Sequence, residues 1–297
     1  GIIAEFIIYV NMLTWPVASL GWISSIVQQA EASQKRINEF LKQKSEITNK
    51  TKAYKKLTGK IEFKNVSFTY EESKIQALKD VDFVIEQNKS LGLIGITGSG
   101  KTTALKLLTR MYNLNSGQIL IDNKIITEFD LESLRKQIGV VPQDSFLFSD
   151  SIINNIRFGD EKANKKEVEE VCKIAGIHDE IIKFKNGYDT ILGERGVNLS
   201  GGQKQRICIA RALIKKPKIL ILDDCLSALD TETELKVIKS LKNYIKNTTT
   251  IISSHRLSSV QNLDEIVVLG DGKIIQKGNH EQLIKEKGYY KELFQKQ

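Results

Sequence analysis

A glycine-rich stretch, GITGSGKTT, constrains this chain more than any other feature of its sequence. It runs from Gly95 to Thr103 and matches the pattern G-x-x-x-x-G-K-[ST]. A strand-like run, Leu91–Ile94, precedes it, and a helical pattern, Lys101–Arg110, follows. A strand, a loop and a helix in this order form a phosphate-binding unit. The glycines let backbone N–H groups turn toward phosphate oxygens, and the helix N-terminus adds a partial positive charge.

The residue types of this loop fit a nucleotide and its metal ion. Lys101 is expected to reach the β- and γ-phosphates, and the Thr102 hydroxyl to bind Mg²⁺. A chance glycine-rich turn is the alternative, and it does not explain a Lys–Thr pair between a strand and a helix. The sequence predicts a nucleotide-binding loop made of Gly95, Ile96, Thr97, Gly98, Ser99, Gly100, Lys101, Thr102 and Thr103.

Strand-like runs and helical patterns alternate through most of the chain. The runs begin at residues 60, 81, 90, 118, 138, 218, 248 and 265, and the helical patterns include 101–110, 203–214 and 232–246. This alternation predicts an α/β domain with a partly parallel sheet. The early strands follow one another without helices, so we also expect an antiparallel portion.

The charge and the cysteines exclude other classes of protein. A net charge of +8 suits nucleic acid or anionic lipid as a partner. The lysines, however, are scattered, without a basic block or interleaved aromatic residues, so we expect no nucleic-acid partner. Cys172, Cys208 and Cys225 lack metal-ligand or disulfide spacing. They are expected to be small buried residues in a reducing compartment.

The segment Phe6–Val27 contains no charged residue. A helix needs about 20 apolar residues to cross a bilayer, so we predict a membrane helix here. Trp22 suits the membrane interface, and membrane helices tolerate a proline such as Pro16. A buried core helix is the alternative, because three polar residues interrupt the segment: Asn11, Thr14 and Ser19.

The sequence after this segment suggests where the domains meet. An amphipathic pattern up to Leu41 continues the helix out of the bilayer, and residues 44–58 are polar and aperiodic. We predict the end of a membrane domain over 1–45, a linker over 46–59 and a nucleotide-binding domain over 60–297. The chain begins with Gly and lacks a signal-peptide layout, so it is expected to be a piece of a longer protein.

A second motif, ILILDDCLSALD, joins four aliphatic residues to two adjacent carboxylates. It runs from Ile219 to Asp230. A hydrophobic strand that ends in Asp accompanies the phosphate loop in nucleotide-binding proteins, and this Asp holds Mg²⁺ through water. Asp223 fits that position, which leaves the role of Asp224 to be explained.

The stretch NLSGGQKQRICIARAL, which begins at Asn198, resembles the signature motif of the ABC-family ATPases. Other elements of that family's pattern occur in order. Tyr70 resembles the aromatic residue that stacks on adenine, Gln143 the Q-loop glutamine, and His255 the switch histidine. Ser227, Ala228, Leu229 and Asp230 resemble the D-loop. The simpler alternatives are a core aromatic for Tyr70 and a polar loop residue for Gln143.

This resemblance covers the chain from about residue 60 onward and implies a fold, ligands and a partner. The fold is a P-loop NTPase domain of the ABC type, with a mixed sheet and a helical subdomain at about 144–205. The ligands are ATP and Mg²⁺, with Thr102, Gln143 and Asp223 at the metal and Asp224, His255 and Gln143 in catalysis. The signature residues Leu199, Ser200, Gly201, Gly202 and Gln203 would contact ATP bound by a second subunit.

The first 45 residues resemble the end of the last membrane helix of an ABC exporter half-transporter. The resemblance implies a multi-pass protein of the cell (inner) membrane, in contact with lipid, with its ATPase domain in the cytoplasm. Its partner would be a second half-transporter, in a homodimer or a heterodimer. The sequence does not indicate the transported substrate.

Asp224 departs from the family pattern, which usually has Glu after the metal-site Asp. That Glu polarises the water that attacks the γ-phosphate, and the Asp carboxylate stands one methylene further back. Proton transfer requires heavy-atom distances of about 2.6–3.2 Å, so we predict slow hydrolysis at this site. One half of a heterodimer with a weakened site fits this pattern, and a slow homodimer is the alternative. A soluble ABC ATPase and a nucleotide switch without turnover are the competing functions.

Overall fold

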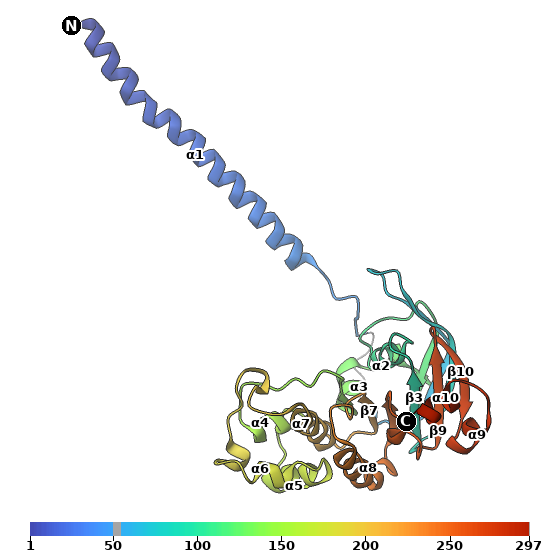
Figure 1. Cartoon of the computed structure of the whole chain (residues 1–297). Coiled ribbons are helices and arrows are strands. Elements are labelled where there is room, and N and C mark those ends of the chain that lie inside the picture. The colour runs from blue at the N-terminus through green and yellow to red at the C-terminus, as the bar shows by residue number, and fades with distance from the viewer. Residues whose placement is uncertain (50–54, 297) are drawn as a thin grey trace. The chain divides into compact units, whose positions relative to one another are not determined.

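The computed structural model describes residues 1–49 and 55–296 (Figure 1). It divides the chain into two units, Gly1–Glu46 and Ile47–Gln297. Residues 50–54 of the predicted linker lie outside the described residues, so the domain boundaries given above stay predictions.

The first unit is built around one helix, α1 (Ile2–Lys42), with Pro16 inside it. The helix is long and apolar enough to cross a membrane by length and composition. Two of its polar side chains bond to its own backbone: Thr14 donates to the Val10 carbonyl and Ser19 to that of Pro16. Large apolar side chains such as Trp22 are exposed within this unit. A continuous apolar surface of this kind requires a lipid or protein environment.

The second unit contains a six-stranded sheet in the order β10-β9-β3-β8-β7-β6. β3, β6, β7, β8 and β9 run parallel, and β10 pairs antiparallel with β9. The strands are β3 (Ser90–Gly95), β6 (Ile138–Val141), β7 (Ile219–Asp223), β8 (Thr249–Ser253), β9 (Glu265–Gly270) and β10 (Lys273–Gly278).

A second, four-stranded sheet is antiparallel throughout, in the order β2-β1-β4-β5. Its strands are β1 (Ile61–Thr69), β2 (Gln76–Ile85), β4 (Ser116–Ile121) and β5 (Lys124–Ile125). The predicted parallel and antiparallel portions are both present. The run expected at residue 118 is a hairpin, because Asp122 and Asn123 adopt positive φ angles of 52° and 60° between β4 and β5. This combination is typical of a tight hairpin turn.

Helices and connecting loops make up the rest of the described part of this unit. The helices are α2 (Lys101–Leu108), α3 (Leu131–Lys136), α4 (Ile152–Arg157), α5 (Lys165–Ile174), α6 (His178–Ile181), α7 (Gly201–Ile214), α8 (Thr231–Ile245), α9 (His280–Lys285) and α10 (Tyr289–Lys296). Short 3₁₀ turns occur at Ile126–Glu128, Gly187–Asp189, Glu194–Gly196 and Leu257–Ser259. The region predicted as a helical subdomain contains α4, α5 and α6 and the start of α7 (Figure 1).

The sequence of strand β7 is apolar without alternation because both faces of the strand are covered. Ile219 and Ile221 pack into a core with the antiparallel sheet and α2. Leu220 and Leu222 pack into a second core with α7 and α8. A strand covered on both faces requires a continuous hydrophobic run. The run ends at Asp223, where the chain leaves the core and the candidate site begins.

Candidate functional site

The register of the parallel strands gathers the predicted site residues at one edge of the sheet. Asp223 of β7 lies opposite Ser253 of β8, and Ser253 lies opposite Leu93 of β3. β6 pairs with β7 up to Val141, two residues before Gln143. The phosphate loop, the two aspartates, His255 and Gln143 therefore all follow the carboxyl ends of adjacent strands, where parallel sheets place their ligands.

The phosphate loop joins β3 to α2, as predicted. Gly100 occupies the N-cap of α2 with φ 102°, a region that glycine enters at low cost. A Cβ at this position would lie 2.4 Å from the Ala77 carbonyl oxygen. The loop therefore requires glycine here both for its backbone conformation and for its packing.

Lys101 bends back onto this loop. Its ammonium donates to the carbonyl oxygens of Gly95 and Ile96 at 2.8 and 2.9 Å. Burial lowers the pKa of the Lys101 ammonium, while the carboxylates of Asp224 and Asp223 act to raise it. The side chain is thus a buried cation that the carbonyl groups of the loop hold in place.

Asp223 and Thr102 lie side by side, as a shared metal ion requires. The Thr102 hydroxyl donates to the Asp223 carboxylate at 3.2 Å, and the same oxygen accepts a short bond from Ser253. Within the described residues no cluster of three His, Cys, Asp or Glu side chains forms a metal cage. Mg²⁺ prefers one or two carboxylates completed by water and substrate phosphates, so this sparse set fits it. Gln143 is exposed beyond β6.

Asp224 has a different environment from its neighbour. Its backbone adopts φ 45°, and its N–H donates to the Ser253 carbonyl and hydroxyl oxygens at 3.0 and 3.1 Å. The side chain is buried, and its Oδ1 has no hydrogen-bond partner among the residues that the structure describes. Burial raises the pKa of the Asp224 carboxyl, and the charge and backbone N–H of His255 oppose that shift. An unpartnered buried carboxylate oxygen is suited to accept a proton from water.

Tyr70 lies against the phosphate-loop helix. Its hydroxyl is 3.0 Å from the Thr103 hydroxyl, and its ring meets Phe68 and Tyr112 edge to face. Tyr70 is half-buried and packs against the core, which fits the core-aromatic alternative. Its role as an adenine platform stays a prediction.

The signature residues lie at the start of α7. Ser200 is the N-cap: its hydroxyl accepts from the Gln203 N–H, and Gln203 accepts from the Ser200 N–H, which forms a capping box. Leu199 is buried, while Ser200 and Gly201 are exposed. Cβ positions on Gly201 and Gly202 would lie 3.7 Å from the Ala228 side chain and 3.0 Å from that of Leu229. The signature therefore adjoins the D-loop of its own chain.

Three residues of this region were not anticipated from the sequence. Ser253 links the two aspartates. Arg256 and Glu234 contact the D-loop and residues 253–259, here called the switch segment. The only sequence signal for Ser253 and Arg256 is their proximity to His255 at the end of a predicted strand. Glu234 is an acidic residue on an amphipathic helix, which normally indicates a solvated side chain.

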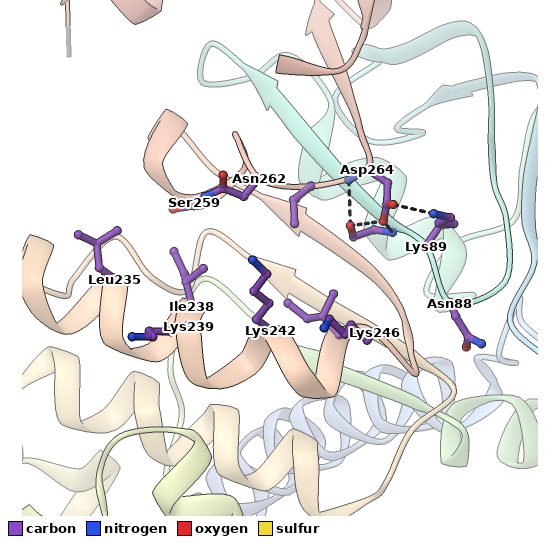
Figure 2. A pocket seen from close by; sticks show the side chains of 13 residues that line it. Asn88, Lys89, Leu235, Ile238, Lys239, Lys242, Lys246, Ser259, Asn262 and Asp264 are labelled. Atoms are coloured by element: carbon purple, nitrogen blue, oxygen red, sulfur yellow. Dashed lines mark hydrogen bonds and ion pairs between the residues drawn. The ribbon is translucent and has the colours of Figure 1, made fainter. Parts of the chain in front are cut away.

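A separate pocket of about 770 Å³ lies between α8 and the starts of β3 and β9 (Figure 2). Lys239, Lys242 and Lys246 line it from α8, and Asp264 accepts from Lys89 across from them. None of the predicted site residues lines this pocket.

The comparisons with known proteins agree with this geometry. A family model described as ABC transporter matches residues 78–227, which is half of the chain. The chain belongs to the ABC transporter family. An ABC transporter ATP-binding protein of Bacillus subtilis, YknU, is 45% identical over 99% of this chain and 51% of its own length. The multidrug resistance-like ATP-binding protein MdlA of Buchnera aphidicola is 44% identical, over 100% and 51%.

A solved structure supports the same assignment for this ABC transporter chain. It is titled as a bacterial Atm1-family ABC exporter with ATP bound. It superposes with a TM-score of 0.85 at 36% identity and covers 97% of this chain and 51% of the exporter chain. The ABC transporter chain thus spans about half the length of the relatives it matches, and the predicted fold class, an ABC ATPase domain preceded by an apolar helix, is confirmed.

Proposed function

We propose that this chain is the ATP-binding and ATP-hydrolysing part of an ABC exporter half-transporter. The observation that carries the proposal is the common edge of the parallel sheet, where Lys101, the Thr102–Asp223 pair and Asp224 lie together. The names of the relatives, which include an ATP-binding protein and an ABC exporter with ATP bound, support the same activity.

The residues at this edge have separable tasks in hydrolysis. The loop N–H groups and Lys101 hold the β- and γ-phosphates and balance the charge that develops as the γ-phosphoryl group leaves ADP. Thr102, Asp223 and Gln143 would hold Mg²⁺, which neutralises phosphate charge. Tyr70 would stack on adenine, and His255 would donate to a γ-phosphate oxygen.

Asp224 is proposed as the base for the attacking water. The water oxygen bonds to the γ-phosphorus, the bond from that phosphorus to the β–γ bridging oxygen breaks, and a water proton moves to the carboxylate. The buried, unpartnered Oδ1 supports this role. The side chain of Asp224 is one methylene shorter than that of the usual Glu. We therefore expect slow turnover, because a retreat of about 1 Å is large for a positioned proton acceptor.

The signature is proposed to act on a second subunit. Ser200 and Gly201 are exposed, and Gly201 adjoins the D-loop residue Ala228 of the same chain. An exposed helix N-terminus with a serine hydroxyl suits an anion brought by another molecule. Two such domains would sandwich two ATP molecules. The site that contains Lys101 and Asp224 of this chain would then be the weakened site of a heterodimer or a slow site of a homodimer.

The proposed location is the cell (inner) membrane, with the ATPase domain in the cytoplasm. The exposed apolar surface of α1 supports a lipid or membrane-helix environment. The full-length protein is proposed to be multi-pass, because the chain spans only about half of its relatives. ATP-driven closure of the two nucleotide domains would then move the membrane helices.

Phosphate release by the full-length transporter in lipid nanodiscs tests this function. We expect MgATP-dependent release that falls at least about a hundredfold in Lys101→Ala, because the variant loses a charge contact to the transferring group. Lys136→Ala is the matched control, since Lys136 forms an exposed ion pair with Glu132 on its own helix. ATP binding without any phosphate release by the wild type would favour the competing function, a nucleotide switch without turnover.

A further inference from the structure

Arg256 follows the switch histidine and reaches across to the D-loop. Its guanidinium donates to the carbonyl oxygens of Leu229 and Ser227, each at 3.1 Å. These two carbonyls flank Ala228, whose own carbonyl oxygen and side chain lie next to the signature glycines. One planar side chain therefore fixes the D-loop backbone at two points.

Glu234 holds Arg256 in this position. Its carboxylate lies 2.8 Å from the guanidinium, and the Glu234 side chain is only 1% exposed. The other oxygen of the carboxylate accepts from the hydroxyls of Ser258 and Ser259. Glu234 belongs to the first turn of α8, whose N-cap is the D-loop residue Asp230. The acid thus connects the end of the D-loop with the segment that follows His255.

The same two segments are joined again on the side of the catalytic carboxylate. The Ser227 hydroxyl donates to the Asp224 carbonyl at 2.8 Å, and the Asp224 N–H donates to Ser253. The Arg256 N–H donates to the Ser254 hydroxyl at 3.0 Å. The contacts form a closed ring from Asp224 through the D-loop and Arg256 back to the end of β8.

We propose that Arg256 and Glu234 are positioning residues of the nucleotide site. They hold the D-loop and the switch segment as one body, so that a displacement of the D-loop moves His255 and Asp224 together. This inference rests on the proposed function. In the hydrogen bonds that the described residues form, Arg256 contacts the D-loop carbonyls and Glu234 and not the phosphate loop. The Arg256–Glu234 pair, here called the bracket, therefore acts on the geometry of hydrolysis rather than on ATP affinity.

Arg256→Lys tests the bracket in the full-length transporter, because a lysine keeps the charge but lacks the fork that reaches two carbonyls and a carboxylate. We expect kcat to fall about tenfold to a hundredfold, as small misplacements of catalytic groups do. The Kd for MgATP is expected to stay within about twofold. Glu234→Gln should give the same pattern, and the double variant should be no slower than the slower single variant, because residues that act as a unit are not additive.

Glu232→Gln and Lys236→Gln are the matched controls. They break an exposed ion pair of 2.6 Å on the same helix, and we expect kcat to stay unchanged. Ser258→Ala, a milder change at the Glu234 carboxylate, gives a second readout if Arg256→Lys does not fold. An unchanged kcat in folded Arg256→Lys, or an equal loss of kcat and ATP affinity, would overturn the proposal.

Amide hydrogen exchange separates this proposal from the proposed function. We expect faster exchange at both residues 227–230 and residues 253–256 in Arg256→Lys than in the wild type, with MgATP bound. Exchange that rises in only one of the two segments contradicts the bracket. A wild type that binds MgATP without hydrolysing it would refute the proposed function, and the exchange data would still decide whether the two segments move together.

Discussion

Lys101 and Ser200 are both expected to contact a phosphate group, yet they lie in opposite environments. Lys101 is buried and donates to carbonyls of its own loop. Ser200 is exposed, and its hydroxyl accepts one bond from its own helix. The phosphate-loop half of the site is organised within the chain, whereas the signature half is presented outward. We therefore expect such a chain to bind a nucleotide by itself and to need a second surface to enclose it.

Removal of the Ser200 hydroxyl is the strongest test of the difference between the two halves of the site. In Ser200→Ala we expect kcat to fall about tenfold to a hundredfold, because a hydrogen bond to a charged group contributes about 1.5–3 kcal/mol. ATP affinity at the phosphate loop of the same chain should stay unchanged. Steady-state phosphate release and equilibrium ATP binding on the assembled transporter provide the two measurements.

The control for Ser200→Ala is another helix cap. Asn279 caps α9 with the same capping box, and the loss of either cap costs about 1 kcal/mol of stability. Asn279→Ala should therefore lower the thermal midpoint as Ser200→Ala does, without a loss of kcat. Equal losses of kcat in the two variants would mean that Ser200 acts only as a cap.

A longer side chain at position 224 tests the phosphate-loop half of the site. In Asp224→Glu we expect kcat to rise about threefold to tenfold, because the carboxylate then reaches the attacking water. The φ of 45° limits the gain, since Asp enters this left-handed region more readily than Glu. Phosphate release from the reconstituted transporter measures the change, with the exposed Asp160→Glu as control. A flat rate at unchanged ATP binding would show that the length of the side chain is not what slows the site.

The sequence predicted those parts of the fold that depend on local pattern. The continuous apolar run of β7 and the glycine, lysine and threonine of the phosphate loop each have one structural interpretation. The hairpin at Asp122 was read as one strand, because its turn contains two polar residues that tolerate positive φ rather than a glycine. A hairpin turn that lacks glycine is therefore harder to predict from the sequence.

The Arg256–Glu234 bracket was not predictable in the same way. Its two residues come from the segment that follows β8 and from the first turn of α8. Neither periodicity nor spacing shows that these elements meet. Glu234 reads as a solvated acid on an amphipathic helix, and only the packing of α8 against the switch segment buries it. Tertiary contacts of this kind depend on the assembled fold rather than on local sequence.

The pH dependence of hydrolysis gives the smallest effect and the most direct test of Asp224. Burial raises the pKa of its carboxyl above the ordinary Asp value of 3.8. The base must be ionised, so kcat/KM, which reports on the free enzyme, should begin to fall at a higher pH than an exposed aspartate would give. We expect a change of a few-fold on acidification, measured at fixed ionic strength.

The stability of the fold should change with pH in the opposite direction. A raised pKa means that the folded state binds a proton more tightly than the unfolded state, so Asp224 contributes a stability gain as the pH falls through its folded pKa toward the unfolded value. Asp224→Asn removes this contribution, because the amide is neutral at every pH. Thermal midpoints of the wild type and Asp224→Asn should therefore converge on acidification, with the variant more stable at neutral pH. A gap that widens as the pH falls would mean that the Asp224 carboxylate is stabilised by its surroundings, and the unpartnered oxygen would no longer explain its suitability as a base.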